Sequence, residues 1–150
     1  MQASIEKIKE LRKRTNISIA ECKKALENTK GDLGKALEIL KKRGTDILTK
    51  KKNRETLEGL IGTYLHPNKK IGSIVKVSCE SDFVAKNEEF QKFVHEIAMQ
   101  VTAMDPKDIK ELLSQPYIKE VEKTVKDLLE ELVAKLGENI KIYNFKRLEV

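Results

Sequence analysis

The apolar residues between positions 71 and 101 change their spacing once, and that change restricts how the chain can fold. Up to Cys79 the residues alternate, with Val75, Val77 and Cys79 on one side and Ile74, Lys76 and Ser78 on the other. Such alternation is typical of a strand with one buried face. After Asn87 the spacing becomes helical, with apolar residues at Phe90, Phe93, Val94, Ile97, Ala98 and Val101. A strand followed by such a helix predicts a sheet with a helix packed on one face.

The surrounding sequence completes this layer. Residues 59–65 form a second strand-like run, and the Pro and Asn of residues 66–70 favour a turn between the two strands. Asp105-Pro106 ends the helix that Asn87 caps. A last helix follows almost at once, marked by Val121, Val125, Leu128, Leu129, Leu132 and Leu136 and closed by Gly137. Residues 140–150 form a final strand, with a bulge expected near Asn144. The pattern predicts an α+β fold, a small antiparallel three-stranded sheet covered by helices.

The first 44 residues differ, because their apolar spacing is helical throughout. Ile5, Ile8 and Leu11 mark a first helix, with Ser4 as a possible N-cap. The segment Ser18-Ile19-Ala20-Glu21 has the form of a capping box and opens a second helix, whose inner face is expected at Ile19, Cys22 and Leu26. Asp32 caps a third helix along Leu33, Ala36, Leu37 and Leu40, and Gly44 stands where a left-handed C-terminal residue is expected. These helices are expected to bury their apolar stripes together.

Net charge also differs between the N-terminal part of the chain and the rest. Residues 1–56 hold 16 Lys and Arg against 8 Asp and Glu, a net charge of +8, whereas residues 57–150 hold 14 against 16, a net charge of −2. We therefore expect a three-helix module over residues 1–44, a basic linker or the frayed extension of a helix over 45–56 and an α+β domain over 57–150. The basic run from Lys50 to Arg54 is interpreted as a solvated hinge in preference to a nucleic-acid contact, since no aromatic residue interleaves it.

Several classes of protein are disfavoured by composition. No apolar run approaches the roughly 18 residues of a membrane span, and the first residues lack the apolar stretch of a signal peptide, so we expect a cytoplasmic protein without membrane contact. Cys22, Cys79, His66 and His95 have none of the usual metal-ligand spacings, and no metal is expected. The cysteines are expected to be reduced and partly buried.

The sequence also lacks the motifs that are typical of catalytic sites. There is no Ser/His/Asp or Cys/His motif, no phosphate-binding loop of the GxxxxGK[ST] type and no GxGxxG after a strand. Glu88 and Glu89 favour the first turn of a helix through its dipole. His95 is expected to be a surface or boundary residue. The sequence therefore predicts a binding protein that has no catalytic residues and no cofactor.

Three segments, in this order, resemble the bacterial elongation factor Ts family. They are LRKRTNISIAECKKALENTKGDLGKALEILKKRG at residues 11–44, CESDFVAKNEEF at 79–90 and LGENIKIYNFKRLE at 136–149. The first is similar to the family's N-terminal module, which is related to ubiquitin-associated domains, and the second to its Thr-Asp-Phe-Val segment. The chain departs from the family at Asn16-Ile17-Ser18, where a Gly-rich stretch is usual, and at Ser81, where Thr is usual. It also has room for only one of the two cores that many members carry.

The resemblance implies a function and a site. Members of the family exchange the guanine nucleotide of elongation factor Tu, and their Phe inserts beside the Mg²⁺ and phosphates of that GTPase. The matching residues here are Ser81, Asp82, Phe83 and Val84, of which Asp82 and Phe83 form the inserting wedge. Spacing alone favours a core position for Phe83, packed against the following helix as a staple. The resemblance instead implies that Phe83 is exposed.

The sequence also predicts a second copy of the chain as a partner and leaves alternative functions open. Because the chain has room for one core where the family usually has two, we expect a homodimer through the 57–150 domain. Apolar contacts between the copies are expected from Tyr143, Phe145 and Leu148. The main alternative is that the chain is a small basic nucleic-acid-binding protein, which its pI of about 9.2 favours. A peptide-binding module built on residues 1–56 and an enzyme rank lower. No direct nucleic-acid contact is expected of an exchange factor.

Overall fold

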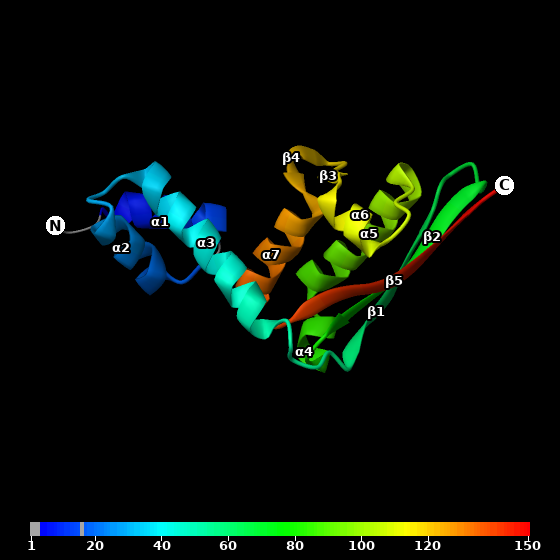
Figure 1. Cartoon of the computed structure of the whole chain (residues 1–150), viewed down its shortest axis with the longest axis horizontal. Coiled ribbons are helices and arrows are strands. Elements are labelled where there is room, and N and C mark those ends of the chain that lie inside the picture. The colour runs from blue at the N-terminus through cyan, green and yellow to red at the C-terminus, as the bar shows by residue number, and fades with distance from the viewer. Residues whose placement is uncertain (1–3, 16) are drawn as a thin grey trace. The chain divides into compact units, whose positions relative to one another are not determined.

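The structure, a computed structural model, describes residues 4–15 and 17–150, and of residues 44–51 it describes the backbone alone. The chain divides into two compact units (Figure 1). One contains the residues up to Lys51 together with Glu130–Gly137, and the other contains Lys52–Leu129 and Glu138–Val150. The α+β class predicted from the sequence is confirmed, with three N-terminal helices followed by a small antiparallel sheet and its helices.

The N-terminal helices are α1 (Ile5–Thr15), α2 (Ile19–Asn28) and α3 (Leu33–Lys51). Their shared core consists of Leu11, Ile17, Cys22, Ala25, Leu26, Ala36 and Leu40, with Ile8, Leu33 and Leu37 packed against it. Two residues of the predicted buried stripes are instead exposed, Ile5 at 71% and Ile19 at 54%. Ile19 is the first residue of α2, one turn before the buried stripe begins at Cys22. Ile17, which precedes the Ser18 cap, reaches the core instead.

The helix caps follow the sequence at two sites and depart from it at a third. Ser18 Oγ accepts a hydrogen bond from the Glu21 amide at 3.3 Å, and Asp32 Oδ1 accepts one from the Lys35 amide at 3.0 Å. Gly44 does not end α3, because the helix continues to Lys51. One glycine costs a helix about 1 kcal/mol relative to alanine, and residues 45–51 contain neither proline nor a second glycine to stop it. The first half of the predicted linker is therefore helical.

The second unit is built on an antiparallel sheet with the strand order β1-β2-β5. Its strands are β1 (Glu58–Leu65), β2 (Ile71–Cys79) and β5 (Ile140–Glu149), and α5 (Glu88–Met104) packs along β1 and β2 (Figure 1). All six residues predicted to line the inner face of α5 are buried. At Gly62 a Cβ atom would lie 2.5 Å from a methyl carbon of Val94, so glycine permits the close approach of β1 to α5.

The predicted bulge in the last strand is present. Asn144 pairs with Lys76 and Ile142 with Val77, which leaves Tyr143 as the extra residue. The Lys76 ammonium lies 4.3 Å from the centre of the Tyr143 ring, within range of a cation–π contact. The bulge keeps Phe145 opposite Val75, on the side of the sheet that α5 packs against.

Residues 107–124 depart from the prediction that a helix follows almost directly after Pro106. They form α6 (Ile109–Ser114) and a hairpin of β3 (Pro116–Tyr117) and β4 (Glu120–Thr124). Gln100 of α5 is fully buried, donates to the Pro116 carbonyl at 3.0 Å and accepts from the Ile118 amide at 3.0 Å. These bonds hold the hairpin against α5.

The last helix, α7 (Val125–Leu136), therefore begins later than predicted. Val121 lies in β4 and is 68% exposed, although its spacing from Val125 fits a helix. The reason is a reciprocal cap at Thr124, whose Oγ1 accepts from the Asp127 amide at 3.1 Å while Asp127 Oδ2 accepts from the Thr124 amide at 3.0 Å. Gly137 follows the helix with φ of 75°, as predicted.

Candidate partner-binding site

The four predicted site residues lie where β2 leads into the helices. Ser81 caps α4 (Asp82–Ala85), a single helical turn, and its Oγ accepts from the Val84 amide at 3.3 Å. Asn87 then caps α5, because its Oδ1 accepts from the amides of Glu89 at 2.8 Å and Phe90 at 3.2 Å. The connection between strand and helix is thus a helical turn, with hydrogen-bonded caps on both sides of it.

This turn separates an exposed side from a buried side. Phe83 is 91% exposed, whereas Val84 and Ala85 are buried. The interpretation of Phe83 as a core residue, which spacing favoured, is therefore wrong. The Phe83 ring is therefore open to contact with another molecule.

Asp82 is exposed beside Phe83. Its Oδ2 lies 2.8 Å from Lys86 Nζ, one turn later, and both side chains are largely open to solvent. The hydrogen bond from the ammonium to Asp82 raises the pKa of Lys86. The wedge, Asp82 and Phe83, therefore presents one carboxylate and one aromatic ring on the same short turn.

Glu138 holds the base of this turn, a role that no pattern in the sequence indicates. Its Oε1 accepts from the amides of Glu80 at 3.1 Å and Ser81 at 2.9 Å, and its Oε2 accepts from the Ser81 hydroxyl at 2.5 Å. Glu138 and Ser81 come from two of the three segments that resemble the family. The only signal in the sequence was the position of Glu138, directly after the glycine that closes a helix.

The neighbouring Asn139 ties in the chain that precedes β1. Its side chain is 1% exposed and donates to the carbonyls of Arg54 at 2.8 Å and Lys52 at 3.4 Å. Arg54 Nη1 lies 3.6 Å from Glu80 Oε1. The end of the predicted basic linker is therefore fixed to the base of the wedge, and the charge of Arg54 is paired. The side chains of Lys50 and Lys51, in the same basic run, lie outside the described residues.

Both cysteines are buried, and Cys79 borders the site. Its Sγ lies 3.2 Å from the Ser81 carbonyl. Burial, with the negative charge of Glu138 as a smaller cause, raises the pKa of the Cys79 thiol to about 11. The thiol is therefore neutral at physiological pH.

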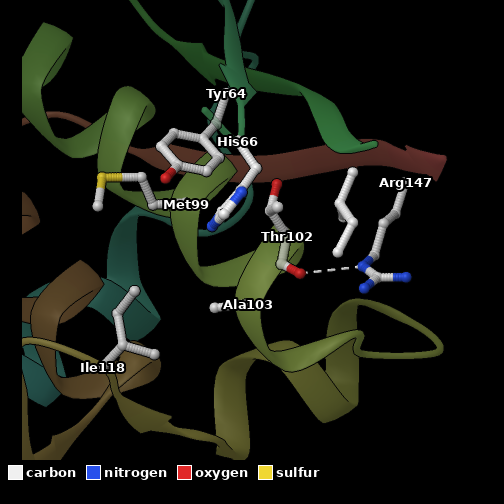
Figure 2. A pocket seen from close by; sticks show the side chains of 8 residues that line it. Tyr64, His66, Met99, Thr102, Ala103, Ile118 and Arg147 are labelled. Carbon is white, nitrogen blue, oxygen red and sulfur yellow. Dashed lines mark hydrogen bonds between the residues drawn. The ribbon is translucent and has the colours of Figure 1, made fainter. Parts of the chain in front are cut away.

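A pocket lies at the opposite end of the sheet. Its volume is about 290 Å³, and it is lined by Tyr64, His66, Ile71, Met99, Thr102, Ala103, Ile118 and Arg147 (Figure 2). Arg147 Nε donates to the Thr102 carbonyl at 3.0 Å, and its Nη1 lies 3.0 Å from Glu149 Oε2 and 3.8 Å from Asp105 Oδ1. These two carboxylates already balance the guanidinium charge, so the pocket is a poor site for an anion. His95 is exposed, as predicted, with its ring edge-on to Tyr64.

Within the described residues, no helix is long and apolar enough to cross a lipid bilayer.

Comparison with known proteins identifies relatives of this chain over most of its length. The family model described as Elongation factor TS matches residues 80–150. Elongation factor Ts of Clostridium novyi is 44% identical over 143 residues, which are 95% of this chain and 47% of that protein. The same factor of Thermosipho melanesiensis is 38% identical over 192 positions, with 98% of each chain covered. That of Thermodesulfovibrio yellowstonii is 37% identical over 194 positions, with 100% of this chain and 97% of the relative covered.

These matches differ in how the lengths compare. The chain spans about half of the Clostridium novyi protein, whereas it spans almost all of the Thermosipho melanesiensis protein. The latter alignment has 192 positions against the 150 residues of this chain, so at least 42 of its positions face gaps here. Identity of this level over nearly the whole chain shows that the protein belongs to the elongation factor Ts family.

Proposed function

We propose that this chain is a guanine-nucleotide exchange factor that binds elongation factor Tu with GDP, promotes GDP release and so lets GTP bind. The observation that carries the proposal is Phe83, which is 91% exposed on a capped helical turn. Membership of the elongation factor Ts family supports the choice of partner and reaction. The proposed action is binding alone, without covalent chemistry or a cofactor.

The four site residues divide into two roles in this proposal. Asp82 and Phe83 contact the partner, since both are exposed. Ser81 and Val84 hold them in place, Ser81 through its cap and Val84 through its burial under the turn. Phe83 enters the region of the partner's Mg²⁺ and phosphates. Affinity for the nucleotide there depends on the metal charge and on backbone amides, so displacing either weakens GDP binding.

The energy for this displacement comes from burial of the wedge. Burying an exposed Phe side chain contributes roughly 1.5–3 kcal/mol, which offsets some of the distortion in the partner. A factor that binds the nucleotide-free partner more tightly than the GDP-bound partner must in turn be weakened by GDP to the same extent. The factor accelerates exchange and leaves the final ratio of GDP to GTP forms to their concentrations.

The N-terminal helices are proposed to add affinity for the same partner. Residues 1–56 carry a net charge of +8, which favours an anionic or mixed surface. Removal of residues 1–51, up to the end of α3, is expected to weaken binding and to leave the sheet unit folded. Unfolding of the sheet unit would show that the boundary is misplaced.

A second copy of the chain is proposed to cover the sheet surface away from α5. This outer sheet face includes five apolar residues, each between 48% and 79% exposed: Ile61, Leu65, Ile74, Tyr143 and Leu148. Of the three residues expected to supply a dimer contact, Phe145 is half-buried and pairs with Val75 instead.

The experiment that tests the function is release of labelled GDP from elongation factor Tu of the same organism. Release is followed with excess unlabelled GDP at rising concentrations of this chain. We expect the rate to rise and then saturate. A rate that stays at the spontaneous value with saturating, folded protein would show the proposal to be wrong. Binding to nucleic acid that weakens steeply with salt, without any exchange, would favour the alternative function.

A further inference from the structure

We infer that Glu138 is a positioning residue for the wedge, because its carboxylate fixes Glu80 and Ser81 and thereby the direction in which Phe83 points. The inference rests on the proposed function of Phe83. It assigns a role in exchange to a residue just before β5 that does not itself contact the nucleotide site. The structural basis is a continuous set of hydrogen bonds from Glu138 to the turn that carries Phe83.

The bonds run in two steps. Glu138 first accepts from two successive backbone amides, those of Glu80 and Ser81, and from the Ser81 hydroxyl. The same hydroxyl oxygen then accepts from the Val84 amide at 3.3 Å and so caps α4. A single carboxylate therefore sets both the end of β2 and the start of the helical turn.

Glu138 is itself held on a rigid base. The next residue, Asn139, is buried and donates to the carbonyls of Lys52 and Arg54. Ile140 follows and pairs with Cys79 across β5 and β2. Because the residues next to Glu138 are fixed in this way, its carboxylate is held in one position and not spread over many rotamers. The carboxylate can therefore fix the position of Ser81.

This arrangement bears on exchange through preorganisation. Phe83 is 91% exposed and has no packing of its own to hold its direction. The backbone below it must therefore supply that direction before the partner arrives. A turn fixed in advance loses less conformational freedom on binding, and a misplacement of about 1 Å can cost on the order of 100-fold in rate.

Glu138→Gln is the most conservative test of this role. The amide oxygen can still accept from the two backbone amides, but the amide nitrogen cannot accept from the Ser81 hydroxyl. The Ser81 hydroxyl would have to turn, and the cap on the Val84 amide would weaken. Glu149→Gln is a matched control, since Glu149 also belongs to the last segment of the chain but pairs with Arg147 at 3.0 Å.

The first measurement is exchange on elongation factor Tu in a double-mutant cycle. We expect Glu138→Gln to slow the accelerated GDP release by about 10-fold to 100-fold and Glu149→Gln to leave it unchanged. In a Phe83→Ala background, Glu138→Gln should have no further effect beyond about twofold, because its action passes through Phe83. An equal loss in both backgrounds would show that Glu138 acts independently of Phe83 and would overturn the inference.

The second measurement needs no partner, so it separates failure of this inference from failure of the proposed function. The chain contains no Trp, so Phe83→Trp places the only Trp of the chain at the wedge, where it can be excited selectively over tyrosine. Time-resolved anisotropy should show a more mobile indole after Glu138→Gln is added, with Ser81→Ala having the same effect and Ser81→Thr, which keeps the hydroxyl, having none. Unchanged mobility in folded Glu138→Gln and Ser81→Ala would overturn the inference even if the unmodified chain is active. If the unmodified chain does not accelerate GDP release, the proposed function fails, whereas the anisotropy still decides whether Glu138 fixes the direction of the turn.

Discussion

Phe83 and Val84 are neighbours in α4, yet 91% of Phe83 is exposed and only 8% of Val84. One helical turn places successive side chains about 100° apart, so a single turn can bury one residue and expose the next. Val84 anchors the turn to the sheet unit, and Phe83 is left free to contact another molecule. A substitution at Val84 should therefore act on stability, whereas a substitution at Phe83 should act on binding.

Phe83→Ala is therefore expected to affect exchange and not folding. Loss of the burial energy of the ring, about 1.5–3 kcal/mol, corresponds to about 10-fold to 100-fold slower accelerated GDP release. The free energy of unfolding, measured in urea, should change by less than about 0.5 kcal/mol. Phe90→Ala is the matched control, because Phe90 is fully buried and its truncation should cost about 3–5 kcal/mol of stability. Equal destabilisation by the two substitutions would contradict an exposed role for Phe83.

Asp82 and Lys86 allow a contact with the partner to be separated from a local ion pair. Both Asp82→Ala and Lys86→Ala remove the same 2.8 Å bridge. Exposed pairs of this kind contribute little to stability, so neither variant should have a notably lower melting temperature. If Asp82 contacts the partner, Asp82→Ala alone slows GDP release. Equal slowing by Lys86→Ala would mean that the bridge, and not the Asp82 carboxylate, matters for exchange.

Local signals in the sequence were sufficient for the elements that position the wedge. Asn87 was predicted as a cap, and the six apolar residues after it were predicted to be buried, because capping and amphipathic spacing act within one or two turns. The same holds for the strand alternation that ends at Cys79. The short helix α4 was missed, since four residues carry too little periodicity to be recognised.

Contacts between distant segments account for what the sequence did not predict. The bond between Glu138 and Ser81 joins residues 57 positions apart, and no local pattern indicates such a pair. The hairpin of β3 and β4 depends in the same way on Gln100, a polar residue whose burial cannot be inferred from its type. The exposure of Phe83 was predicted by family resemblance alone, because apolar spacing favoured the opposite.

Cys79 gives a pH-dependent prediction. Its pKa in the folded protein is about 11 against an ordinary value of 9.0, so the folded state holds the thiol proton more tightly than the unfolded state. Above pH 9 the unfolded state loses this proton first, and stability falls as pH rises towards 11. The stability of the unmodified chain relative to Cys79→Ala should therefore decrease between pH 9 and pH 11.

Unfolding in urea at several pH values measures this difference in stability. Titration of Cys22 does not affect the difference, because both proteins retain that residue. Glu138, Glu58 and Asp82 are the charged residues that affect the Cys79 thiol, and all three are also common to both proteins. A difference in stability that stays constant from pH 8 to pH 11 would show that the thiol titrates normally. Slow alkylation of Cys79 by iodoacetamide at pH 8 in the native protein, and fast alkylation in urea, is the independent check.

The outer sheet face leads to a prediction about assembly. The exposed apolar side chains of Ile61, Leu65 and Ile74 lie on β1 and β2, and those of Tyr143 and Leu148 lie on β5. A face of this kind is expected to be covered in solution, and a two-fold contact between copies covers it with its own equivalent. Sedimentation at micromolar concentration should therefore give twice the mass of 17.2 kDa.

Leu148→Glu tests this contact, because Leu148 is 79% exposed and a charge there has no effect on the buried core. In a dimer the two-fold contact buries this carboxylate near its own copy, so the variant should sediment as a monomer at the same concentration. Val121→Glu is the matched control, since Val121 is 68% exposed but lies in β4, outside this face, and should leave the dimer intact. An unmodified chain that sediments as a 17.2 kDa monomer, and accelerates exchange fully in that form, would rule out the dimer. Dissociation by both variants would instead place the contact elsewhere on the chain.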